Sequence, residues 1–367
     1  MMCKNPEVSV IVVNYNGKHH LQGCLDSLRS QSFRDFEVIL VDNGSEDGSV
    51  DFVLEHYPEV ILVENKKNRG FCGGNNDGIA VSKGKYLFLL NNDTVLDKEC
   101  LNALYSAVKS SPDTCFGIFP KVLFADAPTF INSYGVVWNY RCLWNDHRIG
   151  LIDIDQFARP ERIFGSMFVA LLVKRALFED IGFFDEYMFT YGEDFDVCYR
   201  AGCRGYFFLT EPRAVVYHKF RASSQETRDP LWSFYLFFRN YYYLVLKNLS
   251  WKELWAAKKF LVMLYLYNLY WGYLNREKRR YWLAVKMPLA LLKRSRIIWQ
   301  KRKEVSAKRR VKDFAFWDFQ DRLFHSPFCY CHRPVLNAKN LISALAMEGT
   351  AEAQDTSIFP ICSNQWP

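Results

Sequence analysis

Short apolar runs that end abruptly in polar residues recur along the first hundred residues of the chain. Val8–Asn14 is a β-branched run of this kind, and Tyr86–Leu90 is an apolar run that stops at Asn91. Between these runs, apolar residues return at the spacing of one helix face. The pattern predicts strands over residues 8–14, 36–41, 60–64 and 86–90, and helices over residues 21–30, 48–56 and 73–82. Strands and helices that alternate in this way predict an α/β fold with a doubly wound, mainly parallel sheet.

The alternation becomes less regular beyond the fourth strand. Asp97 is expected to cap a helix that ends near Ser110. Residues 115–173 mix strand-like pieces with loops rich in Asn, Tyr and Trp, which indicates a substrate-facing half. The domain is expected to close with helices over residues 175–181 and 190–200, and with strands over residues 207–209 and 215–217.

The character of the chain changes from Trp232 onward to long aromatic, basic and helical segments. Phe260–Leu274 is apolar except for Asn268, but a bilayer-spanning helix needs ~20 such residues. Helices rich in Trp and Tyr and flanked by Lys and Arg are typical of a membrane interface. The alternative is that they pack on the first domain with solvated basic side chains. We expect domains at 1–230 and 231–312, and a partly disordered tail at 313–367.

Charge divides the chain in the same place as the apolar pattern. The formal net charge is +7, yet residues 219–312 hold 23 Lys and Arg against 5 Asp and Glu, a surplus of 18. An acidic first part and a basic second part indicate two tasks, the second toward a polyanionic surface such as lipid headgroups or nucleic acid.

The cysteines and the start of the chain favour a reducing cytosol. Eleven cysteines are scattered along the sequence, and its first residues lack the long apolar region of a signal peptide. The group His325, Cys329, Cys331 and His332 matches no common zinc spacing, and we assign it no role.

Polar side chains at strand ends are the first candidates for chemistry. Asn91, Asn92 and Asp93 follow the fourth strand, where open α/β sheets hold their ligands. A hard cation such as Mg²⁺ or Mn²⁺ takes one or two carboxylates together with substrate phosphates, so Asp93 alone would be sufficient. Turn formation is the competing interpretation. Asp42, at the end of the second strand, could accept hydrogen bonds from a nucleotide base or ribose.

Two further groups carry titratable side chains. Glu193, Asp194 and Asp196 place three carboxylates within four residues, where one could act as a general base or all could serve a helix N-terminus. His218 follows an apolar strand and could join a metal or a phosphate. Gly73 stands near a helix start that could face phosphate, although its segment is neither a Walker loop nor a dinucleotide fingerprint.

Taken in order, these motifs resemble glycosyltransferase family 2, the inverting enzymes with the GT-A fold, and within it the rhamnosyltransferase-like branch. The resemblance covers about residues 8–245. The matching segments are residues 8–16, 41–45, 68–76, 89–93, 182–186, 191–194 and 238–240.

The resemblance implies a role for each matching residue. Asp194 would be the catalytic base, with Glu193 and Asp196 as additional acidic candidates. Asp93 and His218 would hold Mg²⁺ or Mn²⁺, with Asn91 in place of the first acid of the family's Asp-x-Asp motif. Donor-binding positions would be Asn14, Asp42, Asn68, Gly73, Asn76, Asn92 and Asp93.

The expected activity is transfer of one sugar, such as rhamnose, from a nucleotide-sugar donor to a lipid-linked or polysaccharide acceptor. The chain lacks the Gln-x-x-Arg-Trp of processive members. We expect a peripheral enzyme on the cytoplasmic face of a membrane, without a nucleic-acid partner. Two alternatives are a sugar nucleotidyltransferase and a noncatalytic basic module that binds nucleic acid or anionic membrane.

Overall fold

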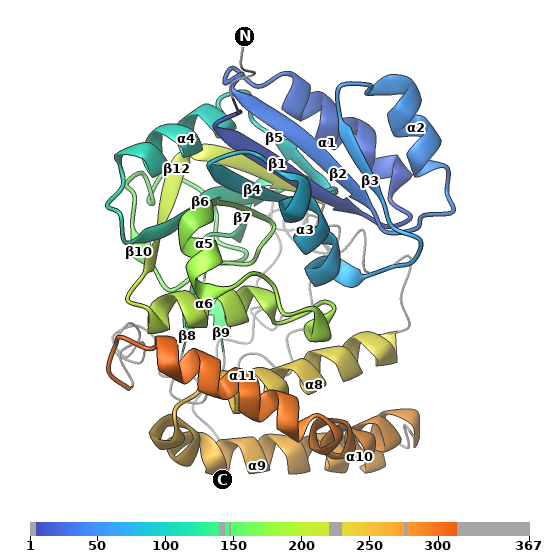
Figure 1. Cartoon of the computed structure of the whole chain (residues 1–367), viewed down its shortest axis with the longest axis vertical. Coiled ribbons are helices and arrows are strands. Elements are labelled where there is room, and N and C mark those ends of the chain that lie inside the picture. The colour runs from blue at the N-terminus through green and yellow to red at the C-terminus, as the bar shows by residue number, and fades with distance from the viewer. Residues whose placement is uncertain (1–4, 139–143, 147, 220–229, 275–277, 314–367) are drawn as a thin grey trace, which may run out of the picture.

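A mixed α/β domain and a layer of C-terminal helices make up the molecule (Figure 1). The computed structural model describes residues 5–138, 144–146, 148–219, 230–274 and 278–313. The strands are β1 (Val8–Asn14), β2 (Phe36–Asp42), β3 (Ile61–Glu64), β4 (Tyr86–Asn91), β5 (Thr94–Leu96), β6 (Cys115–Phe124), β7 (Ala127–Ser133), β8 (Val136–Trp138), β9 (Trp144–Asp146), β10 (Arg162–Ile163), β11 (Ala170–Lys174) and β12 (Phe207–His218).

The helices connect these strands and then continue beyond the sheet. They are α1 (Lys18–Arg29), α2 (Ser49–His56), α3 (Gly70–Val81), α4 (Cys100–Ser110), α5 (Arg175–Ile181), the 3₁₀ turn η1 (Glu186–Met188), α6 (Glu193–Cys203), α8 (Pro230–Asn248), α9 (Trp251–Leu274), α10 (Lys278–Lys293) and α11 (Ser295–Lys308).

The central sheet has the order β10-β12-β6-β11-β4-β1-β2-β3, with β5 beside β12 and β7 beside β6. Its first half, β4-β1-β2-β3, is wholly parallel. β11 runs antiparallel between β4 and β6, and β12 then pairs parallel with β6. The predicted α/β fold is therefore confirmed, on a sheet that is parallel in its first half and mixed in its second half.

Alternating side chains of β1 fill two hydrophobic layers. Val8, Val10 and Val12 pack on the side of α1 and α4. Ile11 faces the opposite layer, which includes residues of α3, α5, α6 and α8. Since both faces of the strand are covered, its sequence is continuously apolar instead of alternating.

Two expectations for local structure are wrong. The strands predicted over residues 207–209 and 215–217 are one strand, β12, whose register with β6 shifts between Glu211 and Val215. Pro212 lies in this irregular stretch, and a proline at a bulge interrupts the apolar pattern without ending the strand. Asp97 is not the N-cap of α4, which is Glu99; the Asp97 carboxylate accepts from the Glu99 amide at 3.0 Å and orders the preceding turn.

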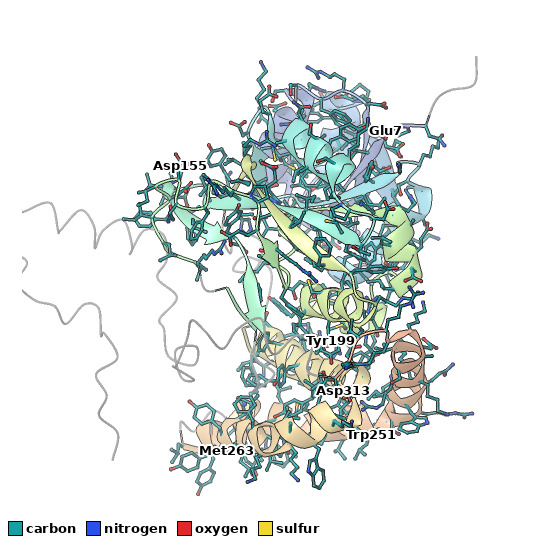
Figure 2. All side chains as sticks on the ribbon, turned by 90° about the vertical axis from the view of Figure 1, so that its left-hand side faces the viewer. Glu7, Asp155, Tyr199, Trp251, Met263 and Asp313 are labelled. Atoms are coloured by element: carbon teal, nitrogen blue, oxygen red, sulfur yellow. The ribbon has the colours of Figure 1, made fainter. Side chains whose placement is uncertain are left out.

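The C-terminal helices form two tiers below the sheet domain (Figure 1). α8 and α11 pack against each other and against α6, whereas α9 and α10 pair at the far end. Figure 2 places Trp251 and Met263 of α9 at the end of the molecule opposite Glu7. Among the helices in the described ranges, none has both the length and the apolar character that crossing a bilayer requires.

Several expectations fall outside the described residues. The tail from residue 314 onward and the group from His325 to His332 belong there. The domain boundary expected at 230/231 coincides with the start of α8 at Pro230 and stays a prediction. The six cysteines that the structure describes are buried and form no disulfide with one another.

Candidate active site

The carboxyl ends of β1, β2 and β4 meet in a buried network of amide and carboxylate groups. Asn14 donates from Nδ2 to Asp42 Oδ2 at 3.0 Å, and its Oδ1 accepts from Asn92 Nδ2 at 2.7 Å. All three side chains are buried. Parallel strands end at one sheet edge, which explains why these predicted donor-site residues come together.

Gly17, the residue before α1, is required by this network and was not singled out from the sequence. A Cβ at position 17 would lie 2.4 Å from Asn92 Nδ2 and 2.7 Å from Asn14 Oδ1. Any side chain there would displace the two amides. The only sequence signal was the glycine itself in a loop after a strand.

Asp42 is fixed by its own turn as well as by Asn14. Its Oδ1 accepts from the amides of Gly44 and Ser45 at 3.1 and 2.7 Å. Gly44 has φ +78°, a left-handed conformation that glycine adopts without strain. The carboxylate therefore has a fixed direction at the sheet edge, and its contact with a nucleotide base stays a prediction.

Asp93 and His218, the predicted metal ligands, lie side by side. Asp93 Oδ1 is 3.3 Å from His218 Nε2, and both side chains are buried. Residues 94–96 of β5 pair with residues 216–218 at the end of β12, and the Lys219 amide donates to the Asp93 carbonyl at 2.9 Å. β12 thus brings a histidine 125 positions later in the sequence to the end of β4.

The surroundings of this pair favour a charged Asp93. Burial opposes the carboxylate, but His218 and His20 outweigh it, and the pKa of Asp93 is lowered. Asn132 Oδ1 lies 2.8 Å from His218 Nδ1. With the proton on Nδ1, Nε2 and Asp93 Oδ1 are both acceptors, and a proton or cation between them removes their repulsion. Neither Asn132 nor His20 carried a signal in the sequence.

The pair provides one oxygen and one nitrogen donor. Within the described ranges, His, Cys, Asp and Glu side chains form no group of three or more that could hold a metal ion. A metal here would therefore need further oxygen atoms, and substrate phosphates supply such atoms in Mg²⁺ sites.

Asp194 stands in the first turn of α6, next to Glu193. Burial raises the pKa of Asp194 to about 6, and the Phe195 amide, 2.7 Å from its Oδ1, partly offsets that rise. A carboxyl with a pKa near neutrality is suited to proton transfer. Asp194 is nevertheless partly exposed to solvent, so its carboxyl stays accessible to a reactant.

Asp196, two residues further along α6, lies in a buried ion network. Its Oδ2 pairs with Arg200 Nε at 2.9 Å, and its Oδ1 is 2.6 Å from Lys247 Nζ. Lys247 of α8 also pairs with Asp185 at 3.0 Å, and Asp185 in turn pairs with Lys301 of α11 at 2.6 Å. The cations Lys247 and Lys301 lower the pKa of Asp185 despite its burial. This network joins α6 to the C-terminal helices, so Asp196 has a structural role that is separate from catalysis.

The loop before Asp194 has an unusual backbone. Phe189, Tyr191 and Gly192 have φ angles of 65°, 72° and 86°. Left-handed conformations of non-glycine residues cost free energy and persist only where neighbouring groups hold them. This loop therefore depends on contacts outside itself.

Asn240 of α8 supplies those contacts. Its Nδ2 lies 2.7, 2.8 and 2.8 Å from the carbonyl oxygens of Met188, Thr190 and Tyr191. Arg239 donates to Asn240 Oδ1 at 2.7 Å, and because a guanidinium can only donate, it directs the amide nitrogen of Asn240 toward the loop. The sequence marked this Arg-Asn pair as a motif but gave no role for it.

The remaining predicted donor residues lie at and inside α3. Asn68 accepts from the Gly70 amide at 2.7 Å and forms the turn before the helix. Gly73 lies within α3, where a Cβ would approach Arg69 Cβ to 2.7 Å. Asn76 exchanges hydrogen bonds of 3.0 and 3.1 Å with the backbone of Phe184. Each residue thus has a structural partner, and its contact with a donor stays a prediction.

Comparison with known proteins agrees with this geometry. Residues 9–182 match the model of glycosyl transferase family 2. A poly(ribitol-phosphate) beta-glucosyltransferase of Bacillus spizizenii is 32% identical over 111 residues, 29% of this chain and 18% of that protein. Glycosyltransferase GlyG of Streptococcus pneumoniae is 30% identical over 105 residues, 28% of this chain and 35% of that protein. The chain thus matches only about a third or less of these two relatives.

A solved structure supports the fold assignment. The crystal structure of GalNAc-T7 with UDP, GalNAc and Mn²⁺ superposes with a TM-score of 0.55 at 18% identity, over 68% of this chain and 49% of that chain. Residues 9–182 of the chain therefore match glycosyl transferase family 2, and the sheet domain has a GT-A fold that the C-terminal helices extend.

Proposed function

We propose that the chain is an inverting glycosyltransferase that moves a single sugar from a nucleotide-sugar donor to a glycan acceptor in cell-surface glycan synthesis. The observation that carries the proposal is Asp194, a partly accessible carboxyl with a raised pKa in the first turn of α6. The Asn14, Asp42 and Asn92 network and the Asp93–His218 pair supply the donor side. Family membership supports the same reaction class.

The proposed mechanism is a single displacement. Asp194 accepts the proton of an acceptor hydroxyl as the oxygen attacks the anomeric carbon of the donor sugar. The bond from that carbon to the diphosphate oxygen breaks on the opposite face, so the configuration inverts. Asp42 and Asn14, which are buried at the sheet edge and hydrogen-bonded to each other, would hold the nucleoside.

Asp93 and His218 fit a weakly held divalent cation. Their oxygen and nitrogen atoms are 3.3 Å apart, and a cation would take the place of a proton between them. A hydrogen bond from a ligating histidine to a neighbouring acceptor is a usual feature of metal sites, and Asn132 Oδ1 provides that acceptor. Mg²⁺ or Mn²⁺ would neutralise negative charge on the leaving diphosphate.

We expect Asp93→Asn to weaken Mn²⁺ binding in the presence of nucleotide diphosphate by about 100-fold. Mutation of a residue that only hydrogen-bonds a metal ligand lowers metal affinity about 10- to 100-fold, and this change removes the single carboxylate ligand itself. The electron paramagnetic resonance signal of free Mn²⁺ measures the binding. Asp51→Asn, an exposed aspartate on α2, is the control. Equal Mn²⁺ affinity of Asp93→Asn and wild type would remove Asp93 as a ligand.

We expect kcat/KM to fall about tenfold per pH unit below about pH 6, because Asp194 must be unprotonated to act as a base. The raised pKa also means that the folded chain binds this proton more tightly than the unfolded chain. The stability contributed by this carboxyl is therefore present at low pH and is lost as the pH rises through about 6. Initial rates between pH 4.5 and 8 at constant ionic strength measure this acidic limb of the pH profile. A flat profile down to pH 5 contradicts the assignment of Asp194 as the base.

The identity of donor and acceptor is the finer part of the proposal. We propose a lipid-linked or polysaccharide acceptor at the cytoplasmic face of a membrane, with rhamnose as one candidate sugar. A panel of UDP-, dTDP- and GDP-sugars with Mg²⁺ or Mn²⁺, scored by nucleotide release, tests the reaction class. UDP-sugars come first because GalNAc-T7 was crystallised with UDP. No release from any donor with lipid-linked acceptors present contradicts the proposed function.

A further inference from the structure

We infer that α9 and α10 form a membrane-binding surface that recognises anionic lipid headgroups. The surface consists of Trp255, Met263, Leu266, Tyr270 and Tyr273 on α9, and we call it the outer face; Trp282 on the paired helix α10 is exposed as well. This inference names a lipid partner in addition to the proposed function, and vesicle binding tests it without donor or acceptor.

The outer face is a continuous stripe along α9. Met263 follows Trp255 after eight residues, with Lys259 halfway between them, and Leu266, Tyr270 and Tyr273 then follow at intervals of three, four and three residues. These spacings place all of them on one side of the helix. Trp255 and Tyr273 are 72% and 73% exposed, so the stripe is uncovered at both ends.

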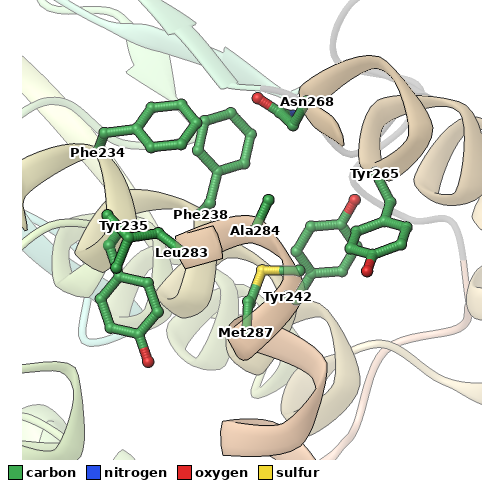
Figure 3. Close-up of a pocket in the computed structure, with 9 residues that line it drawn as sticks. All are labelled: Phe234, Tyr235, Phe238, Tyr242, Tyr265, Asn268, Leu283, Ala284 and Met287. Carbon is green, nitrogen blue, oxygen red and sulfur yellow. The ribbon is translucent and has the colours of Figure 1, made fainter. Parts of the chain in front are cut away.

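The inner side of α9 is already filled. Figure 3 shows Tyr265 and Asn268 of α9 near aromatic side chains of α8 and near Met287 of α10. The space enclosed there measures about 10 Å³, hardly room for one water molecule. α9 therefore has apolar side chains on both of its sides, although a helix of that kind is normally buried all round.

The outer face includes a shallow hollow near the end of α9 and the start of α10. It measures about 610 Å³ and is lined by Leu266, Tyr267, Leu269, Tyr270, Tyr273 and Tyr281. Tyrosine and tryptophan favour the headgroup level of a bilayer because their rings are apolar and their polar atoms stay hydrated. The hollow thus offers apolar walls to lipid acyl chains, while the polar atoms of its tyrosines stay at the headgroup level in contact with water.

Charge selects an anionic lipid as the occupant. Lys252 and Lys259 on α9 and Lys278 and Lys286 on α10 are exposed. The only acidic residue of the two helices is Glu253, which is buried and accepts from Tyr199 at 2.7 Å. Basic side chains beside an exposed aromatic stripe suit a helix that lies in the interface, and α9 lacks the apolar length and character to cross it.

Vesicle co-sedimentation of the full chain tests the inference. We expect binding to vesicles of phosphatidylcholine and phosphatidylglycerol in equal parts, weaker binding to phosphatidylcholine alone, and weaker binding at high salt. Equal binding to both vesicles, or none to either, overturns it. Preference for an oligonucleotide over the anionic vesicles also overturns it, as does a stable dimer that Leu266→Ser dissociates.

Two pairs of matched variants assign the binding to the outer face. Lys252→Glu with Lys259→Glu should weaken binding to the anionic vesicles by about 25-fold or more, since each lysine near the surface contributes about fivefold. Lys83→Glu with Lys109→Glu changes the net charge equally on other exposed lysines and should leave binding unchanged. Equal losses in both double variants contradict the inference.

The apolar contribution has its own pair of variants. Leu266→Ser should weaken vesicle binding severalfold at any salt concentration, because it removes an exposed apolar side chain from the stripe. Leu54→Ser on α2, where the leucine is similarly exposed, should not change it. Both leucines are on the surface, so neither change opens a cavity. Unchanged vesicle binding by Leu266→Ser overturns the apolar part of the inference.

Discussion

Asp194→Asn is expected to reduce the turnover number by about 1,000-fold, since general-base catalysis contributes about 100- to 10,000-fold. An asparagine keeps the size of the side chain and can still interact with the Phe195 amide, but it cannot take the proton of the acceptor. Nucleotide binding should be unchanged, because the proposed donor-binding residues Asn14, Asp42 and Asn92 lie on other elements. Initial rates and calorimetric titration with nucleotide measure the two effects.

Two matched variants separate catalysis from the general effect of losing an acid. Asp51→Asn removes an acidic residue from the first turn of α2 and should leave turnover intact. Glu193→Gln changes the neighbour of Asp194 at the same helix end and should have much the smaller effect. If Glu193→Gln abolishes turnover while Asp194→Asn keeps it, Glu193 is the base instead.

Asn240→Leu is expected to lower the turnover number by about 100-fold and to destabilise the fold by about 2–3 kcal/mol. The leucine removes the Asn240 donor from the carbonyls of Thr190 and Tyr191, whereas the Met188 carbonyl still accepts from Arg239 and from the Thr190 amide. An unpaired buried polar group costs about 1–3 kcal/mol. The left-handed residues of that loop would then relax, and a shift of about 1 Å at a catalytic group can cost 100-fold. Initial rates and thermal unfolding measure both effects.

Asn268→Leu is the matched control for that experiment. Asn268 is a buried asparagine of α9 whose amide donates at 2.7 Å to the Leu264 carbonyl of its own helix, away from the loop before Asp194. It should leave turnover and the pH profile unchanged. In Asn240→Leu, the acidic limb should move below pH 6 as water reaches Asp194, with a much smaller change in donor KM. An unchanged limb together with wild-type turnover contradicts a positioning role for Asn240.

The strand ends illustrate what could be predicted from the sequence. Asn14, Asp42 and Asp93 each follow an apolar run, and parallel strands must bring such residues to one edge. The resemblance selected Asp194 among three neighbouring acids, and His218 was proposed from its place after an apolar strand. The contact of His218 with Asp93 depends on β12 pairing with β5, a strand of three residues that was not predicted. Short strands carry too little pattern for detection.

Other features have no local signal at all. Asn132 and His218 are 86 positions apart, and Asn240 is about 50 positions from the carbonyls that it binds. Lys247 looked like one more basic residue of a basic helix, yet it lies buried between Asp185 and Asp196. The roles of these side chains depend on burial and on pairing with distant residues, and the spacing of neighbouring residues predicts neither.

For the C-terminal helices too, the sequence predicted the elements but not their contacts. Its sequence predicted basic, aromatic helices and left two interpretations open, packing on the first domain or lying in a membrane interface. The tertiary structure assigns packing to α8 and α11, through Asn240, Lys247 and Lys301. It leaves the apolar stripe of α9 uncovered.

The α/β order, the polar strand ends and the resemblance to the family could all be predicted, because they follow from local periodicity and contiguous motifs. The meetings of side chains could not: His218 with Asp93, Asn240 with the loop before Asp194, and Lys247 with two buried carboxylates. The physical reason is that the pKa of a group and the strain of a loop depend on contacts between distant segments, which exist only after folding.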